Sequence, residues 1–368
     1  MKNELIKAMI IVLTSFVASA IIMIFMKKIA KHLGAIDMPR EEEEHRHIHK
    51  KATPKLGAVG IYLAFLIGFM LFGEQSTRMN SILIATFIII LTGISDDIKP
   101  IRARNKLLGH IIAASIIVFY GKILLTGVQV FGFVIDFGLF AYPLTILFLV
   151  ACTNIISLID GLDGLSGGIC TIFYISVLIL GFFQWRMGTL VMILGLIMLG
   201  STLGFLVHNF YPASIFAGDC VGFEGFMIGI ITLLEFKGLA LISFFIPVAI
   251  LGVPILDTLF AIIRRLLKGQ PPFKADKEHL HHQLLGMHLS QRAAVLVIYL
   301  IESLFAGASL LYVLADNSIY GLVLYGIITV IVIWFVLHTS IISENSKTIT
   351  KSLMNRIKNI INIRKTRQ

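Results

Sequence analysis

Charged residues are scarce in this chain. Asp, Glu, Lys and Arg make up 14% of its 368 residues, whereas hydrophobic residues make up 57%. Soluble globular proteins carry roughly 25% charged residues, and one water-soluble core could not bury this much apolar surface. A mean hydropathy of +0.91 points the same way. The composition therefore excludes an ordinary soluble domain and predicts an all-α, polytopic membrane protein.

Cysteine is also rare. The chain has three cysteines, all in or beside apolar segments: Cys152, Cys170 and Cys220. An odd number of thiols without a Cys-x-x-Cys pair predicts neither a disulfide framework nor a thiolate metal site.

Negative charge is in deficit, because 21 acidic residues face 31 basic ones and the formal net charge is +10. In a membrane protein, such an excess indicates cytoplasmic loops and contact with anionic lipid headgroups before it indicates nucleic acid. We therefore expect membrane contacts and no nucleic-acid partner.

What the chain has in abundance is apolar runs of about the length that crosses a bilayer. We expect eleven spans, at residues 5–26, 56–73, 79–94, 107–121, 141–156, 166–183, 187–207, 222–236, 238–263, 292–314 and 319–341. Residues 122–140 instead mix β-branched residues with glycines, which predicts an extracytoplasmic loop with a short hairpin.

The basic residues predict the orientation. With loops numbered from the first span, 25 of the 31 Lys and Arg residues fall in odd loops or the C-terminal tail; the other six are Lys2, Lys7, Arg78, Lys122, Arg186 and Lys237. The positive-inside rule then puts the N-terminus outside, and the odd loops and C-terminus in the cytoplasm. We expect residues 1–343 to form one integral-membrane domain and 344–368 a basic cytoplasmic tail on the inner leaflet.

The stretch from Asn154 to Gly168, NIISLIDGLDGLSGG, lies on one of these cytoplasmic loops. Its Asp160 and Asp163 are three residues apart among glycines. A helix start or tight turn can put such residues on one side, so that both face a common ligand. Alternatively, one aspartate caps the next helix and the other solvates a turn.

Two more acidic motifs lie on the same predicted face. Asp96 and Asp97 end the third span. Adjacent carboxylates repel unless a cation or a raised pKa relieves them, so the pair predicts a metal site or a general base rather than helix-end solvation. Asp219, in FAGDCVGFEGF, is weak evidence alone, and nearby Glu224 is either a buried polar residue or a support for the site.

Histidines are concentrated too, since seven of eleven fall in two cytoplasmic loops. His279, His281 and His282 follow a helix with Asp257 and Arg265, and HxHH lacks the partners of a common zinc motif. Together with the aspartates, these residues suit a diphosphate held with Mg²⁺. Three lysines could add phosphate contacts, or serve only as positive-inside anchors: Lys51, Lys55 and Lys106.

Taken in order, these motifs resemble the polyprenyl-phosphate N-acetylhexosamine-1-phosphate transferases, and most closely their WecA/TagO-like branch, related to MraY. The most specific pieces are DD at 96–97, DGLDGLSGG at 160–168, PILDTLFAIIRRL at 254–266 and HLHHQLLGMHLSQR at 279–292. The chain departs from the family pattern at Ala58, Ser157 and Cys220.

The resemblance implies an enzyme of the bacterial cytoplasmic membrane. It would transfer GlcNAc-1-phosphate from UDP-GlcNAc to undecaprenyl or another polyprenyl phosphate, with Mg²⁺ or Mn²⁺, and release UMP. This is the first membrane step of a cell-envelope glycan such as teichoic acid, O-antigen or lipopolysaccharide. The resemblance is also compatible with a homodimer.

Residue by residue, the resemblance implies Asp219 and Asp97 as Mg²⁺ ligands and Asp96 as the group that orients or deprotonates the lipid phosphate. Asn154, Asp160 and Asp163 would surround the nucleotide and metal. The diphosphate or sugar would be bound by Arg265, His279, His281 and His282, and weaker phosphate contacts would come from Lys51, Lys55 and Lys106.

Two alternatives stay open at this point. The donor could be another UDP-sugar, such as UDP-MurNAc-pentapeptide or UDP-GalNAc. The chain could instead be an ion-coupled transporter, but transporters place coupling acids near the bilayer midplane and often show internal repeats. Here the acids gather on one face, and no internal repeat is evident.

Overall fold

The computed structural model describes residues 2–38, 52–130, 133–184, 189–235, 251–267, 279–314 and 319–338. Within these ranges the fold is all-α apart from two small antiparallel sheets, β1–β2 (Ile36–Asp37 with Thr53–Pro54) and β3–β4 (Gly127–Val130 with Phe133–Asp136). The predicted fold class is therefore confirmed. The helices are α1 (Lys2–His32), α2 (Gly57–Phe72), α3 (Thr77–Ile98), α4 (Ala103–Ser115), α5 (Ala141–Ile159), α6 (Leu165–Phe183), α7 (Leu190–Asn209), α8 (Gly222–Glu235), α10 (Gly252–Leu267), α11 (Leu280–Gly286), α12 (Gln291–Leu314) and α13 (Ile319–His338).

Most predicted spans correspond to a helix. Six described helices or helical segments are long and apolar enough to cross a membrane: Lys2–His32, Thr77–Ile98, Gly138–Ile159, Leu165–Phe183, Leu190–Asn209 and Gln291–Tyr312. Of the predicted span 238–263, only the part from residue 251 lies within the described residues, where α10 begins at Gly252. The tail 344–368 lies outside them. The count of eleven spans and the membrane orientation stay predictions.

The segment between the fourth and fifth predicted spans is a hairpin, as its β-branched residues predict. Val128 pairs with Ile135 and Gly127 with Asp136 in an antiparallel register. Before it, α4 continues into a π-helical turn over Ile116–Tyr120, so that the predicted span 107–121 is one continuous helical segment.

Small residues allow a close helix contact between α1 and α7. A Cβ at Gly200 would lie 2.4 Å from the Val12 carbonyl oxygen, and one at Gly204 would lie 2.5 Å from the Phe16 carbonyl oxygen. Ser19 on α1 donates from its Oγ to the Ser201 carbonyl at 2.6 Å. In lipid, where helices gain little from hydrophobic contact with each other, such close backbone approach stabilises packing.

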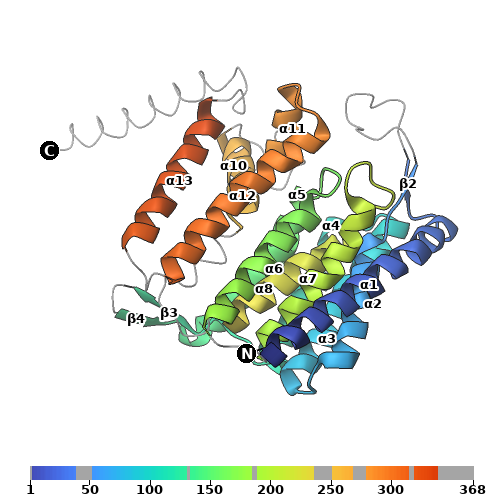
Figure 1. Cartoon of the computed structure of the whole chain (residues 1–368), viewed down its shortest axis with the longest axis horizontal. Coiled ribbons are helices and arrows are strands. Elements are labelled where there is room, and N and C mark those ends of the chain that lie inside the picture. Colours follow the sequence, from blue (N-terminus) through green and yellow to red (C-terminus); the bar gives the residue numbers. More distant parts are fainter. Residues whose placement is uncertain are drawn as a thin grey trace.

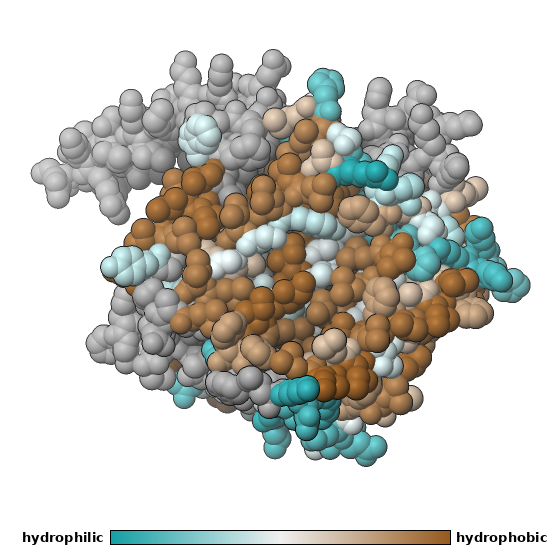
Figure 2. Space-filling model, in the orientation of Figure 1, coloured by the Kyte–Doolittle hydropathy of each residue, from teal (hydrophilic) through white to brown (hydrophobic). Residues whose placement is uncertain are grey.

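The helices run side by side, so their loops gather at two ends (Figure 1). The hairpin β3–β4 lies at the lower end of the view, whereas β2, α11 and the end of α5 lie at the upper end. Between these ends, the visible face is covered mainly by hydrophobic residues, with hydrophilic groups at the rims (Figure 2). Large apolar side chains such as Met9, Leu13 and Met70 are exposed on the helices, which suits lipid contact.

Candidate active site

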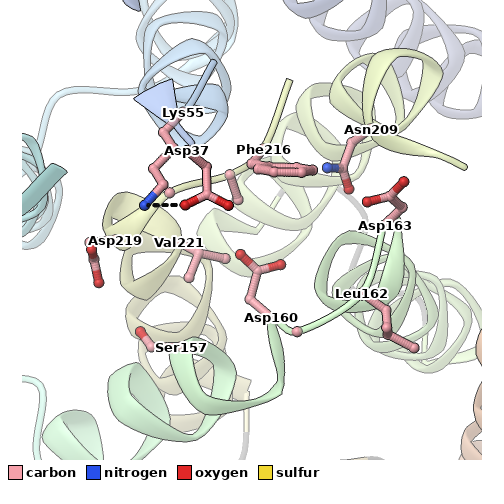
Figure 3. Close-up of a pocket in the computed structure, with 13 residues that line it drawn as sticks. Asp37, Lys55, Ser157, Asp160, Leu162, Asp163, Asn209, Phe216, Asp219 and Val221 are labelled. Carbon is pink, nitrogen blue, oxygen red and sulfur yellow. Dashed lines mark ion pairs between the residues drawn. The ribbon is translucent and has the colours of Figure 1, made fainter. Parts of the chain in front are cut away.

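A polar cavity of about 260 Å³ opens among the loops at the upper end of the bundle. Four parts of the fold line it: the β1–β2 strand pair with the residue after β2, the end of α5 with the loop after it, the end of α7, and the loop before α8 (Figure 3). The lining residues are Asp37, Lys55, Ser157, Asp160, Gly161, Leu162, Asp163, Asn209, Phe216, Ala217, Gly218, Asp219 and Val221. The sequence stretch with two aspartates is therefore part of a site, together with Asp219.

The first aspartate of that stretch ends α5 and faces the middle of the cavity (Figure 3). Asp160 accepts a hydrogen bond from the Ser166 hydroxyl at 2.5 Å. Burial and, to a smaller extent, the nearby carboxylates raise the pKa of Asp160 to about 6, against the lowering effect of the Ser166 hydrogen bond. This side chain therefore sits in a concentration of negative charge that a cation would relieve.

The second aspartate holds a loop. Asp163 is 3% exposed, and its Oδ2 accepts from the Ala213 backbone N–H at 2.9 Å. Next to it, Asn209 accepts from the Gly164 N–H and donates to the Ile215 carbonyl, both at 2.9 Å. The two side chains lie together at the side of the cavity opposite Asp219 (Figure 3). Asp163 thus lines the site while tying the loop after α5 to the loop after α7.

The predicted Asp pair and Asp219 meet although 122 residues separate Asp97 from Asp219. The backbone N–H of Asp219 donates to Asp97 Oδ1 at 2.9 Å. Asp97 Oδ2 is buried, and none of the described residues gives it a hydrogen bond. Gly218, with φ of +77°, passes over this carboxylate, and a Cβ there would lie 2.5 Å from Asp97 Oδ2. Glycine at this position allows both the left-handed backbone and the close approach.

Lys106 joins the same cluster. Its Nζ lies 3.1 Å from Asp96 Oδ2 and 2.5 Å from Asp219 Oδ1. The other oxygen of Asp96 accepts from the Ile101 N–H at 2.8 Å. Both oxygens of Asp96 are therefore engaged in holding the turn between α3 and α4 and the ammonium of Lys106.

Backbone hydrogen bonds connect the loop before Asp219 to the first loop of the chain. The Phe216 N–H donates to the Pro54 carbonyl at 2.8 Å, and the Gly57 N–H donates back to Phe216 at 2.8 Å. Lys55, one of the predicted phosphate contacts, pairs with Asp37 at 3.4 Å at the edge of the cavity (Figure 3). Lys51 lies outside the described residues.

The predicted histidine cluster is held by α10. Asp257 accepts from the Leu280 N–H at 2.8 Å and pairs with His279 Nδ1 at 2.9 Å. It thereby supplies the cap that α11 lacks from its own sequence, since His279 makes no capping hydrogen bond. The rings of His279 and His281 lie parallel with centroids 5.8 Å apart.

His281 connects the histidines to the cavity. A Cβ at Gly161 would lie 2.3 Å from His281 Nε2, so the buried ring packs directly on the loop that carries Asp160. Burial lowers the pKa of His281 to about 3, and His282 lowers it further. The ring is therefore neutral at neutral pH, which favours support of this loop over charge pairing with a diphosphate.

Other sequence candidates lie farther out. Asn154 donates to the Val150 carbonyl at 2.7 Å and lies 3.3 Å from His110 Nδ1, and it does not line the cavity. Arg265 is buried on α10. Glu224 accepts from the Tyr174 and Thr202 hydroxyls, both at 2.6 Å, inside the helix bundle. Glu224 is therefore a buried polar residue with its oxygens satisfied, which resolves the choice that the sequence left open.

Several lining residues were not expected from the sequence as site residues. Asp37 and Asn209 come from segments without a chemical motif, and Phe216 is the first residue of the FAGDCVGFEGF motif, of which only Asp219 was expected in the site. Ser157 stands one helical turn before the end of α5, where periodicity alone could have placed it on the face of Asp160.

Comparison with known proteins agrees with these findings. Residues 79–235 match the family described as "Glycosyl transferase family 4". The chain is 38% identical to the "Probable undecaprenyl-phosphate N-acetylglucosaminyl 1-phosphate transferase" of Bacillus subtilis over 95% of this chain and 97% of that protein.

Two further relatives are more distant. A "Decaprenyl-phosphate N-acetylglucosaminephosphotransferase" of Mycolicibacterium smegmatis is 32% identical over 75% of each chain. The "Undecaprenyl-phosphate alpha-N-acetylglucosaminyl 1-phosphate transferase" of Escherichia coli K12 is 25% identical over 80% of this chain and 81% of its own. The apolar helices and these bacterial relatives support a multi-pass enzyme of the bacterial cytoplasmic membrane. The chain therefore belongs to glycosyl transferase family 4 and, within it, to the WecA/TagO-like polyprenyl-phosphate sugar-1-phosphate transferases.

Proposed function

We propose that this enzyme transfers GlcNAc-1-phosphate from UDP-GlcNAc to a polyprenyl phosphate such as undecaprenyl phosphate, giving polyprenyl-diphosphate-GlcNAc and UMP. The observation that carries the proposal is the convergence of Asp97, Asp160 and Asp219 from three distant segments at one end of a membrane helix bundle. A site at helix ends can reach both a lipid phosphate at the bilayer surface and a nucleotide sugar in water. The names of the relatives supply the two substrates.

The donor set suits Mg²⁺, with Mn²⁺ as a substitute. Asp97 Oδ2 is a buried carboxylate oxygen without a partner, and the Asp219 side chain is 40% exposed. Among the described residues, no three His, Cys, Asp or Glu side chains come close enough to hold a metal ion by themselves. Mg²⁺ commonly uses one or two carboxylates and completes its shell with substrate phosphates and water. We assign Asp97 and Asp219 as its protein ligands.

Phosphoryl transfer needs positioning and charge neutralisation more than a covalent protein step. The bound metal would neutralise the diphosphate oxygens. The acceptor phosphate is itself an anionic nucleophile, so no side chain has to generate it. Asp96 has both oxygens engaged, by the Ile101 N–H and by Lys106, and acts as a positioning residue for that lysine instead of a general base.

The remaining residues bind the donor. The loop at Asp160 and Gly161 forms one wall of the cavity and faces the nucleotide. Asp163 and Asn209 keep the loop after α7 against this wall. Lys55 contributes a cation at the rim for a phosphate. We assign His279, His282 and Arg265 as contacts to the diphosphate or sugar. The ring centroids of His279 and His282 lie 5.8 Å and 4.3 Å from that of His281, which packs on this loop.

The test uses purified protein in detergent with UDP-GlcNAc, undecaprenyl phosphate and Mg²⁺, and measures UMP release. We expect UMP to appear only when all three are present. Absence of UMP with every UDP-N-acetylhexosamine, or full activity in Asp219→Ala, would contradict the proposed function.

Competition in the same assay separates donors. Unlabelled UDP-GlcNAc should suppress turnover of labelled UDP-GlcNAc far better than UDP-GalNAc or UDP-MurNAc-pentapeptide does. The product would begin a cell-envelope glycan. Light scattering of the detergent complex checks the homodimer, which should give twice the protein mass of one chain.

A further inference from the structure

We propose that Lys106 is a built-in counter-cation of the metal site, which occupies a ligand oxygen of Asp219 and competes with a divalent cation for it. The inference rests on the proposed function, because it takes Asp219 as a metal ligand. It goes beyond a phosphate contact, because it couples metal binding to the release of the Lys106 ammonium from Asp219.

The contact geometry carries the argument. Lys106 Nζ lies 2.5 Å from Asp219 Oδ1, at ion-pair contact, and 3.1 Å from Asp96 Oδ2. The lysine side chain is only 19% exposed, so water screens this pair less than a surface pair. The ammonium of Lys106 therefore occupies a carboxylate oxygen that Asp219 would offer to a metal ion.

A metal ion and the ammonium of Lys106 compete for Asp219 Oδ1. A divalent ion bound to this oxygen would lie a few ångströms from the ammonium, where like-charge repulsion is large even with an effective dielectric constant of about 20. Pairing with Lys106 therefore weakens metal binding at Asp219 Oδ1, and a metal ion that takes this oxygen favours release of the lysine.

Asp96 can hold the Lys106 ammonium after it has left Asp219. Its Oδ1 is fixed by the Ile101 N–H, so the carboxylate keeps its position at the start of the α3–α4 turn while Oδ2 holds the lysine. The ammonium, freed from Asp219, then has donors available for an anionic oxygen of a substrate phosphate. Metal binding would thus prepare a phosphate contact at the same site.

Lys55 offers a matched control. It is a second lysine at the cavity, it pairs with Asp37 at 3.4 Å, and its charge also acts on Asp97. Replacing it removes the same unit of positive charge near the acids without freeing an oxygen of Asp219. Comparing the two lysines separates direct competition from a general change in the electrostatic field.

The experiment measures Mn²⁺ binding to detergent-purified protein by electron paramagnetic resonance, without lipid or nucleotide. We expect Lys106→Gln to tighten the Asp219-dependent Mn²⁺ site about tenfold or more, and Lys55→Gln to tighten it threefold or less, because a released ligand oxygen adds to the change in field. Lys106→Met, which is also uncharged, should reproduce Lys106→Gln. Unchanged elution and melting profiles confirm that each variant is folded.

The outcomes distinguish the two proposals. If wild-type protein has an Asp219-dependent Mn²⁺ site that Lys106→Gln and Lys106→Met weaken, or tighten no more than Lys55→Gln does, the counter-cation inference is overturned while the proposed function stands. If Asp219→Ala binds Mn²⁺ as wild type does, the metal assignment within the proposed function fails, and the inference fails with it.

Discussion

Two groups of acids in this enzyme differ in how their carboxylate oxygens are paired. Inside the helix bundle, Glu224 is 1% exposed and receives one hydroxyl hydrogen bond on each oxygen, from Tyr174 and Thr202. At the end of the bundle, Asp97 keeps one oxygen without a partner, and Asp219 depends on a lysine from another helix. Glu224 therefore has a neutral donor for each of its oxygens, whereas Asp97 and Asp219 do not.

The difference has a physical reading. A buried polar group costs free energy unless it is hydrogen-bonded, and Glu224 meets this requirement with neutral donors from α6 and α7. The cavity acids keep unmet coordination capacity, which a ligand can use. For Glu224 and the cavity acids, we infer that hydrogen-bond satisfaction separates a role in the fold from a role in the chemistry. The following variants test this division, beginning with the largest expected effect.

Asp219→Ala should abolish transfer, with UMP release lowered about a thousandfold or more, because it removes a carboxylate from the site of charge neutralisation. The melting temperature should change little, since the lost ion pair with Lys106 is partly exposed. Assays of UMP release and of thermal unfolding on the same preparation check this. A large drop in melting temperature together with retained specific activity would contradict it.

Asp257 tests whether a satisfied acid can also serve the site. Asp257→Ala removes the α11 cap and the His279 partner, and we expect about a 10- to 100-fold loss in kcat/KM, as for other partners of site histidines. Asp257→Asn keeps an oxygen for the Leu280 N–H and should recover most of the activity. The two variants should be compared at matched expression, with kcat and KM for UDP-GlcNAc measured separately. Equal losses of kcat/KM in Asp257→Ala and Asp257→Asn would show that the carboxylate acts on His279 and not through the cap on α11.

Glu224→Ala tests the other side of the comparison. It leaves the Tyr174 and Thr202 hydroxyls without their partner, so we expect a stability loss of about 3 kcal/mol. Activity per folded molecule should stay within about twofold of wild type, because Glu224 does not line the cavity. Thermal unfolding followed with UMP release after removal of aggregate checks this. Loss of specific activity in protein that remains folded would place Glu224 with the catalytic acids.

Asp160→Asn should have the smallest effect of these variants, and this effect is a gain in stability that depends on pH. Burial raises the pKa of Asp160 to about 6 in the folded protein, above the value of about 4 in an unfolded chain. Between these values the folded state binds more protons, so stability falls as pH rises through about 4 to 6 and stays lower above it. Without metal, Asp160→Asn should be more stable than wild type at pH 7.5, by about 2 kcal/mol, and no more stable at pH 4.5. Melting curves in EDTA at both pH values measure this, and a gain independent of pH would contradict it.

Much of the fold could be predicted from the sequence, because a span needs an apolar run long enough to cross the bilayer. The long spans, the hairpin at Gly127–Asp136 and the grouping of Asp97, Asp160 and Asp219 at one end all follow from that pattern together with the loop positions.

Helix periodicity could place Ser157 on the face of Asp160, but the partners of most individual side chains could not be predicted in this way. Asn154 and Ser157 lie on the same helix, yet Asn154 meets His110 and Ser157 lines the cavity. Asp163 bonds a backbone N–H fifty residues later in the chain. Such partners are set by how distant helix ends meet, and no local pattern encodes them.

The bond from the Asp219 backbone N–H to Asp97 makes the spacing of the two acids a property of the backbone around residue 219. Gly218 passes over the Asp97 carboxylate, and a Cβ at Gly93 would lie 2.6 Å from the Cα of Cys220, the next residue after Asp219. A larger side chain at either glycine would therefore move this backbone and change the distance between the two charges.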